Sequence, residues 1–195
     1  GIRAVIDVLA RLSADLPAFI GVVIHRGAVS ADNWSQVIGM KTSLRVVEPA
    51  DGDALERGVV YVAPADCHMR FERDRVRLDG DAKKHFTRPA VDPLFSSAAL
   101  AYGPRVVAVV LTGGGHDGML GLLDVSTAGG LALVQKPSEA ADASMPTYAI
   151  AHDHVLAALG VDEIGDALAQ LARGEVVGIS AAEAAAARDT GSEGA

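Results

Sequence analysis

The chain has 195 residues, of which 50% are hydrophobic and 22% charged, so it is long and apolar enough to fold around its own core. A formal net charge of −8 provides no basic surface to neutralise phosphates, which argues against a nucleic-acid partner. The single cysteine, Cys67, excludes an intramolecular disulfide and is typical of a reducing compartment. Because no apolar run approaches the length of about 18 residues that a spanning helix needs, we expect a cytoplasmic protein that is not inserted in a membrane.

From its first residue, the chain alternates between helix-like and strand-like segments. Apolar residues recur at helical spacing from Ile2 to Leu12, and a buried strand is predicted over 18–25. The pattern then predicts a helix over 30–39, strands over 44–47 and 59–63, an exposed hairpin or edge strand over 70–79, and a helix over 93–102. Next come a buried strand from Val106, a glycine-rich loop, a helix to about Ala128, a strand over 131–135 and a helix over 155–171.

This alternation predicts an α/β fold, a doubly wound and mainly parallel sheet flanked by helices. We expect one domain over 1–179, followed over 180–195 by a tail that has few groups to bury and is disordered. The beginning is irregular. A doubly wound sheet usually opens with a strand that leads into the first helix, whereas this chain opens with the helix.

Two polar side chains fall at the carboxyl edge of the predicted sheet, where open α/β sheets collect their catalytic groups. His25 ends one buried strand, and Asp117 lies in the glycine loop after another. A carboxylate fixes the tautomer and orientation of a histidine and stabilises its protonated form, so the pair could be the base half of a hydrolase triad. The alternatives are a structural histidine and an aspartate that caps the following helix. His152 and His154 form an H-x-H pair, which is a weak indication of a metal site.

The glycine loop also allows a second function. Gly113, Gly115 and Gly118 match G-x-G-x-x-G between a strand and a helix, the context of a dinucleotide-binding site. That fingerprint normally lies in the first βαβ unit, and the next strand normally ends in an acidic residue that holds a ribose. Here the loop lies past the middle of the chain and the next strand ends in Gln135, so dinucleotide binding is the more distant alternative.

Several segments point to one family because they occur together and in order. They are VVIHR at 22–26, EPADGDALERGVVYVAPADCHM at 48–69, RPAVDPLFSSAA at 88–99, LTGGGHDGMLGL at 111–122 and, more loosely, Gln135 and Met145-Pro146. In these segments the chain resembles the chemotaxis protein-glutamate methylesterases (CheB-type catalytic domains), from Gly1 to about Leu168. The resemblance implies a doubly wound α/β fold and a Ser-His-Asp triad.

Such enzymes hydrolyse glutamate γ-methyl esters on chemoreceptors to glutamate and methanol, and many also deamidate receptor glutamines. By this resemblance His25 is the general base and Asp117 is its orienting carboxylate. The neighbourhood of the substrate or oxyanion is then formed by Gly1, Thr112, Gly114 and Met145. The resemblance implies no cofactor and no metal, and it implies a partner, the methylated cytoplasmic region of a chemoreceptor or a similar protein substrate.

The nucleophile is the missing part. The family's serine lies in a Ser-x-Gly-Gly turn at the end of the first strand, and Gly1 resembles the second glycine of that turn. We therefore expect the serine three positions before Gly1, and we expect the chain to be an amino-terminally truncated part of a longer domain, inactive by itself. The alternative is a degenerate homologue that binds a receptor or another partner without hydrolysis. Cys67, next to His68, is a weak substitute nucleophile, because it follows a proline turn and nothing suggests a base placed to activate it.

Three residues depart from the family pattern. Gly114 replaces a methionine, Thr87 stands where a histidine commonly precedes Arg-Pro, and Ser144 replaces the glycine before Met-Pro. These changes predict a divergent member, whose substrate need not be a chemoreceptor.

Overall fold

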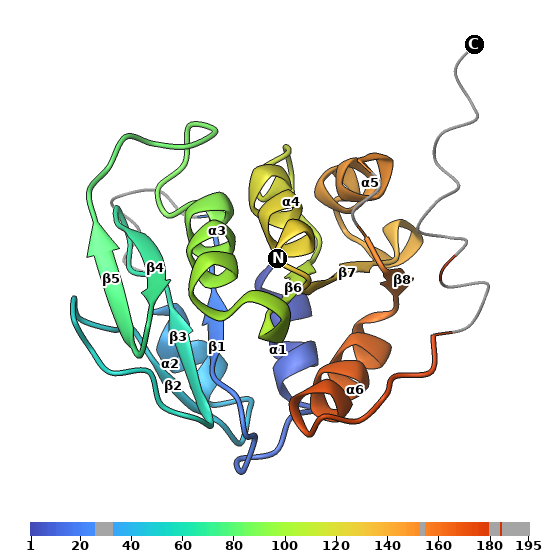
Figure 1. The fold of residues 1–195 in the computed structure, drawn as a ribbon, viewed down its shortest axis with the longest axis horizontal. Helices are drawn as coiled ribbons and strands as arrows, with labels where there is room; N and C mark the ends of the chain where they lie inside the picture. The colour runs from blue at the N-terminus through green and yellow to red at the C-terminus, as the bar shows by residue number, and fades with distance from the viewer. Residues whose placement is uncertain (26–32, 153–154, 180–183, 185–195) are drawn as a thin grey trace.

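A computed structural model describes residues 1–25, 33–152, 155–179 and 184, in which helices and strands alternate along the chain (Figure 1). The elements in order are α1 (Ile2–Leu9), β1 (Ile20–Val22), α2 (Trp34–Gly39), β2 (Arg45–Val47), β3 (Val59–Val62), β4 (His68–Glu72), β5 (Arg75–Asp79), α3 (Val91–Tyr102), η1 (Gly103–Arg105), β6 (Val107–Val110), α4 (Met119–Thr127), β7 (Leu131–Gln135), η2 (Pro137–Glu139), α5 (Ser144–Ala151), β8 (Ala157–Leu159) and α6 (Val161–Ala172).

The strands form two parallel sheets and one hairpin. Strands β1, β3 and β2 form a three-stranded sheet in the order β1-β3-β2, and β6, β7 and β8 form a second in the order β6-β7-β8. Strands β4 and β5 form the hairpin predicted over 70–79. Within the described residues, no strand pairs with the outer edge of β1 or of β6. The predicted α/β fold with mainly parallel sheets is confirmed.

Helices cover both faces of the sheets. Helices α3, α4 and α5 pack on one face, where their apolar side chains meet Val110 and Val134. Helices α1, α2 and α6 pack on the other face. In Figure 1, α4 and α5 lie above β7 and β8, and α6 lies below them. Helix α1 contacts both sheets, because Leu9 packs in the cluster of β1 and β3, whereas Val8 packs in the cluster of β7 and β8.

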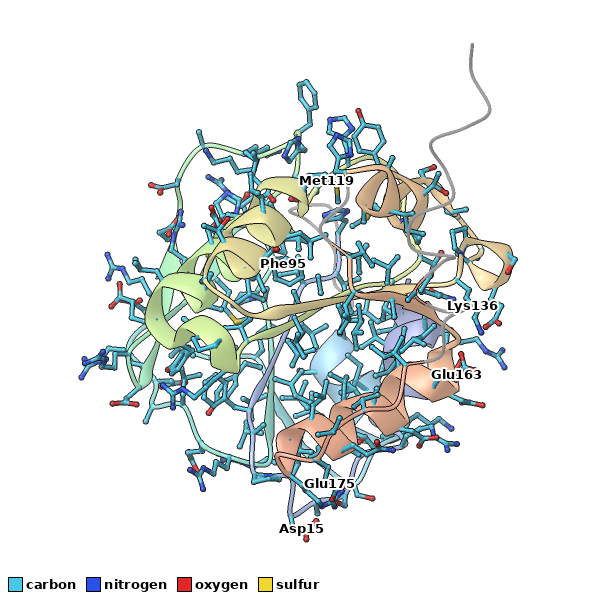
Figure 2. The ribbon with its side chains drawn as sticks, turned by 45° about the vertical axis from the view of Figure 1, so that its right-hand side comes forward. Asp15, Phe95, Met119, Lys136, Glu163 and Glu175 are labelled. Atoms are coloured by element: carbon cyan, nitrogen blue, oxygen red, sulfur yellow. The ribbon has the colours of Figure 1, made fainter. Side chains whose placement is uncertain are left out.

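Polar contacts join the second sheet to α6. Lys136, which follows β7, forms a 2.9 Å ion pair with Glu163 in the first turn of α6, and Figure 2 shows the two side chains close together. The Glu163 carboxylate also accepts a 2.6 Å hydrogen bond from the backbone N–H of Gly160, which closes the start of the helix.

The predicted helix over 155–171 is wrong in its first part. Strand β8 occupies Ala157–Leu159 and pairs in parallel with β7, and α6 begins only after Gly160. Alanine and leucine favour a helix when they stand alone, but here pairing with a buried strand overrides that weak preference. Helix α5 was not predicted at all, because its apolar residues do not form a clear stripe.

Other boundaries differ by a few residues. The predicted helix over 2–12 ends at Leu9, the strand over 18–25 is regular only from Ile20 to Val22, and the helix over 93–102 begins at Val91. Of the helix predicted over 30–39, residues 34–39 are helical, and 30–32 lie outside the described residues. The tail predicted over 180–195 also lies outside them, apart from Ala184. In the described part of the chain, no helix is both long and apolar enough to cross a membrane.

Candidate active site

His25 and Asp117 meet at the carboxyl edge of the two sheets. His25 follows β1, and Asp117 lies in the loop between β6 and α4. The imidazole Nε2 of His25 lies 2.7 Å from Oδ2 of Asp117. The aspartate side chain is buried, with 2% of its surface exposed, whereas 28% of the histidine side chain is exposed. The buried aspartate therefore holds the imidazole ring, and part of the ring remains accessible to solvent.

Asp117 is fixed by the backbone of α3 as well as by His25. Its Oδ2 accepts a 2.6 Å hydrogen bond from the N–H of Val91, and its Oδ1 accepts a 3.1 Å hydrogen bond from the N–H of Asp92. Helix α3 has no side-chain cap of its own at Ala90, so Asp117 caps this helix from a distant part of the chain. The alternative that Asp117 caps the following helix is wrong, because α4 begins at Met119 and its N-cap, Gly118, has no side-chain cap.

These contacts determine the charge of the pair. Burial raises the pKa of Asp117, but the hydrogen bonds from His25, Val91 and Asp92 outweigh it and hold this pKa below its usual value. The carboxylate is therefore an anion that can only accept hydrogen bonds, so Nε2 of His25 must carry the proton between them. In the neutral imidazole, Nδ1 is then the unprotonated nitrogen. In this geometry Nδ1 of His25 can act as a base, and the contact between Nε2 and Asp117 orients the ring.

A second histidine–aspartate pair, which the sequence did not indicate, adjoins the first. Nε2 of His85 lies 2.9 Å from Oδ2 of Asp92, and Oδ1 of Asp92 accepts a 2.9 Å hydrogen bond from the N–H of Gly121 in α4. Its one signal in the sequence is an acidic residue, Asp92, directly before the helix predicted over 93–102, and acidic residues are common at helix starts.

His85, Asp92 and Asp117 each offer one possible metal ligand, and these atoms lie within 4.8 Å of one another. Both oxygens of each carboxylate already participate in hydrogen bonds, with His25, His85 or backbone N–H groups. Since a metal ion would have to displace them, this donor set fits a hydrogen-bond network better than a metal centre.

The other predicted site residues gather beside the same loop. The N–H of Thr112 donates to Oε1 of Gln135 at 2.9 Å, and the N–H of Met145 donates to the carbonyl of Gly113 at 2.9 Å. Gly1 lies at the start of α1, where a Cβ atom would lie 3.6 Å from the carbonyl oxygen of Thr112. The start of α1 and the loop after β6 are therefore neighbours.

Asp142 was missed by the sequence analysis, and it holds this group of residues together. Its backbone N–H donates to Oγ1 of Thr112 at 2.8 Å, and its carboxylate accepts hydrogen bonds from the N–H and the hydroxyl of Ser144. Its Oδ2 lies 3.0 Å from the position that a Cβ of Gly114 would take. The missing side chain at Gly114 thus leaves the space in which Asp142 lies.

Two of the three motif glycines leave no room for a phosphate. A Cβ at Gly113 would lie 2.5 Å from Sδ of Met145, and one at Gly118 would lie 3.0 Å from Val91, so the protein's own side chains fill the space at both. Of the three, only Gly115 has nothing within 4 Å of its Cβ position. The structure gives no support to the dinucleotide alternative.

The remaining candidates have no described hydrogen bond with the pair or lie outside the described residues. Cys67 is half-buried and in no disulfide, and Nδ1 of His152 lies 2.8 Å from the carbonyl oxygen of Tyr148. His154 lies outside the described residues. Among the residues that the structure describes, no serine, threonine or cysteine side chain is hydrogen-bonded to His25.

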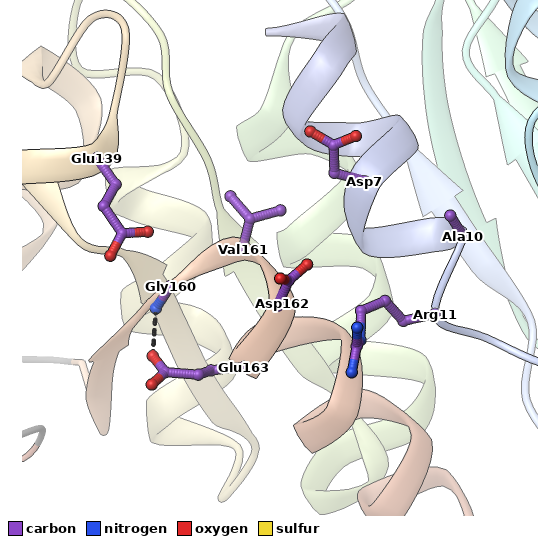
Figure 3. Close-up of a pocket in the computed structure, with 8 residues that line it drawn as sticks. All are labelled: Asp7, Ala10, Arg11, Glu139, Gly160, Val161, Asp162 and Glu163. Carbon is purple, nitrogen blue, oxygen red and sulfur yellow. Dashed lines mark hydrogen bonds between the residues drawn. The ribbon is translucent and has the colours of Figure 1, made fainter.

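A pocket of about 660 Å³ lies elsewhere, between the end of α1 and the start of α6 (Figure 3). Asp7, Glu139, Asp162 and Glu163 give it an acidic lining, and Arg11 is its one basic residue. None of the predicted site residues lines this pocket, so it does not belong to the site around His25.

Fold and site together define an open α/β protein with a His–Asp pair at the carboxyl edge of its sheets. A family model described as CheB methylesterase matches residues 1–168. The chain belongs to the CheB methylesterase family.

Relatives and a solved structure agree with this family. A protein-glutamate methylesterase/protein-glutamine glutaminase of Anaeromyxobacter dehalogenans is 39% identical over 171 residues, which are 87% of this chain and 50% of that protein. A relative from Leptospira interrogans is 32% identical over 172 residues, covering 88% of this chain and 89% of its own. The crystal structure of the Thermotoga maritima CheB methylesterase catalytic domain superposes with a TM-score of 0.85 at 29% identity, covering 88% of this chain and 93% of that one. The chain thus spans nearly all of some relatives and about half of others.

Proposed function

We propose that this chain is the catalytic part of a protein-glutamate methylesterase that also acts as a protein-glutamine glutaminase. The observation that carries the proposal is the 2.7 Å contact between His25 and the buried Asp117, in a chain of the CheB methylesterase family. The substrate is a glutamate γ-methyl ester in a protein, the methylated cytoplasmic region of a chemoreceptor or a similar segment, and the protein works in the cytoplasm.

The nucleophile in this proposal is a serine three positions before Gly1. Two features support that position. Gly1 lies beside Thr112, and β1 and β6 each have one edge that no described strand pairs with. A strand leading into α1 between these edges would satisfy their backbone groups and bring its last residues to the carboxyl edge, near His25.

The reaction then follows acyl-transfer logic. Nδ1 of His25 takes the serine proton as the serine oxygen attacks the ester carbonyl, and Asp117 stabilises the imidazolium that forms. Backbone N–H groups at the start of α1, at the positive end of the helix dipole, stabilise the oxyanion, with Thr112, Gly114 and Met145 around it. The C–O bond to the methoxy group breaks, and His25 protonates the leaving group to methanol. Water, deprotonated by His25, then releases the glutamate from the serine. With a glutamine substrate, ammonia leaves in place of methanol and the product is again glutamate.

The test is methanol release from a methylated receptor fragment by the full-length protein. We expect His25→Ala to abolish it and Asp117→Asn to reduce kcat by about 10⁴-fold, because the asparagine cannot hold the catalytic tautomer. Asp124→Asn, on the exposed side of α4, is the matched control and is expected to keep wild-type activity.

Wild-type turnover by His25→Ala would overturn the assignment. Tight binding of the receptor fragment with no methanol release by the wild-type protein would instead support the partner-binding alternative. An alanine or glycine three positions before Gly1 would point the same way.

A further inference from the structure

The two histidine–aspartate pairs form one connected chain of contacts. His85 contacts the carboxylate of Asp92 at 2.9 Å, the backbone N–H of Asp92 contacts Asp117 at 3.1 Å, and Asp117 contacts His25 at 2.7 Å. The Asp92 carboxylate also accepts the N–H of Gly121, in the helix that follows Asp117. Asp92 therefore holds Asp117 with its backbone and holds α4 with its side chain.

The loop adopts an unfavourable backbone conformation where it presents His85. His85 and Phe86 have φ angles of 47° and 64°, the left-handed region that residues other than glycine seldom adopt. Burial does not compensate at Phe86, because its side chain is 96% exposed. His85 does make contacts, with Asp92 and with the ring of His116 at 5.1 Å between centroids. Strained residues of this kind cluster at functional sites, where the surrounding contacts hold them in place.

His85 contacts one of two buried carboxylates that lie close together. Asp92 and Asp117 are both buried, and their carboxylates belong to a group of atoms within 4.8 Å of one another. Two carboxylates so close repel each other, and a buried carboxylate needs a donor or a positive charge on each side. His25 supplies this for Asp117, and His85 supplies it for Asp92.

We infer that His85 is a positioning residue of the active site: by holding Asp92, it fixes the N–H groups at the start of α3 that orient Asp117 against His25. The kinetic test of this inference rests on the proposed esterase function, whereas the NMR test described below does not depend on that function. His85 acts through Asp92 and touches no substrate. A change at His85 should consequently affect the rate of the chemical step and leave substrate binding unchanged.

Kinetics of the full-length protein test this directly. We expect His85→Ala to lower kcat about tenfold with an unchanged KM, because even a small displacement of a catalytic group lowers the rate of the chemical step. His85→Gln keeps an N–H donor toward Asp92 and should recover part of the loss. In an Asp92→Asn background, His85→Ala should change kcat less than about twofold, since its partner is already altered. Lys83→Ala, in the same loop, is the control and should behave as wild type.

A second readout needs no substrate. The proton shared by Nε2 of His25 and Asp117 should give a downfield proton NMR signal, which we expect His85→Ala to shift or broaden and Lys83→Ala to leave in place. An unmoved signal, a wild-type kcat, or a change confined to KM would each overturn the inference. If the wild-type protein hydrolyses no methyl ester, the proposed function fails, and the NMR signal still decides the role of His85.

Discussion

At the scale of single residues, Asp117 is buried, ionised and hydrogen-bonded on both oxygens. Burial alone would raise its pKa, and the contacts with His25, Val91 and Asp92 reverse that effect. A carboxyl group whose pKa is depressed in the folded state stabilises the fold above its unfolded pKa, which is about 4. This stabilisation is lost as the pH falls through the lower, folded pKa.

Asp117→Asn should therefore destabilise the protein by about 2 kcal/mol at neutral pH, because the amide cannot accept every hydrogen bond that the carboxylate accepts. The difference between wild type and variant should shrink as the pH falls below about 4, where the carboxyl group of the unfolded chain becomes protonated, and toward the lower pKa of the folded protein, where the native carboxylate is protonated as well. Urea unfolding of both proteins at neutral and acidic pH measures this. A difference that stays constant over the whole pH range would contradict the assigned charge of Asp117, and Asp124→Asn supplies a surface control.

The sequence was informative about His25 and Asp117 because each follows a recognisable buried strand, and parallel strands bring their carboxyl ends to one edge. It did not indicate that His85 and Asp92 pair. His85 comes from an irregular loop, and a loop's side-chain direction depends on backbone angles that residue types do not determine. Asp142 was missed for a similar reason, since its place follows from loop contacts with Thr112 and Ser144.

At the scale of elements, α3 and α4 pack unusually closely. Gly121 in α4 makes this approach possible, because a Cβ there would lie 2.4 Å from Cβ of Phe95 and 3.2 Å from the carbonyl of Asp92. Figure 2 shows Phe95 on α3, beside α4. The same contact carries the hydrogen bond from Gly121 to Asp92. The close packing of α3 against α4 therefore also holds Asp92 in position beside the site.

Gly121→Ala should consequently cost about 2 kcal/mol of stability through overpacking, although alanine is the better helix former. Gly80→Ala is the matched control: nothing lies within 4 Å of its Cβ position, so we expect a change of less than about 1 kcal/mol. Thermal unfolding of both variants compares them. Equal melting temperatures would show that α3 and α4 can separate without penalty.

Strand β8 shows where element prediction fails. Only Gly160 separates its short run of alanine and leucine from α6, and a single glycine is a weak signal of a boundary because α6 itself contains Gly165. The boundary is set by β7, because three residues of the run pair in parallel with its edge, with Ala157 opposite Leu133. Elements defined by their own periodicity, such as α1, were predictable, and this one was defined by its neighbour.

At the scale of the whole molecule, the fold is two parallel sheets held together by helices. Strands β3 and β7 are central and paired on both sides, whereas β1 and β6 each have one edge without a described partner. Helix α1 packs against both sheets through Val8 and Leu9. A strand between β1 and β6 would turn the two sheets into one.

Hydrogen exchange of the full-length protein tests that arrangement. If a strand preceding α1 pairs with both edges, the amides of β1 and β6 should exchange as slowly as those of β3 and β7, because all would open only with global unfolding. Fast exchange confined to β1 and β6 would show that the edges stay open and would remove the support for a serine beside His25. The amides of β2 and β8, which end their sheets, provide an internal reference for an open edge.

The capping of α3 by Asp117 has an evolutionary consequence. Because the helix has no cap of its own, the fold needs this carboxylate whether or not the protein catalyses anything. A descendant that lost its nucleophile would still be selected to keep the aspartate, and to keep at position 25 a side chain that donates a hydrogen bond to it. Among divergent homologues, an aspartate at position 117 therefore reports an intact fold rather than retained chemistry.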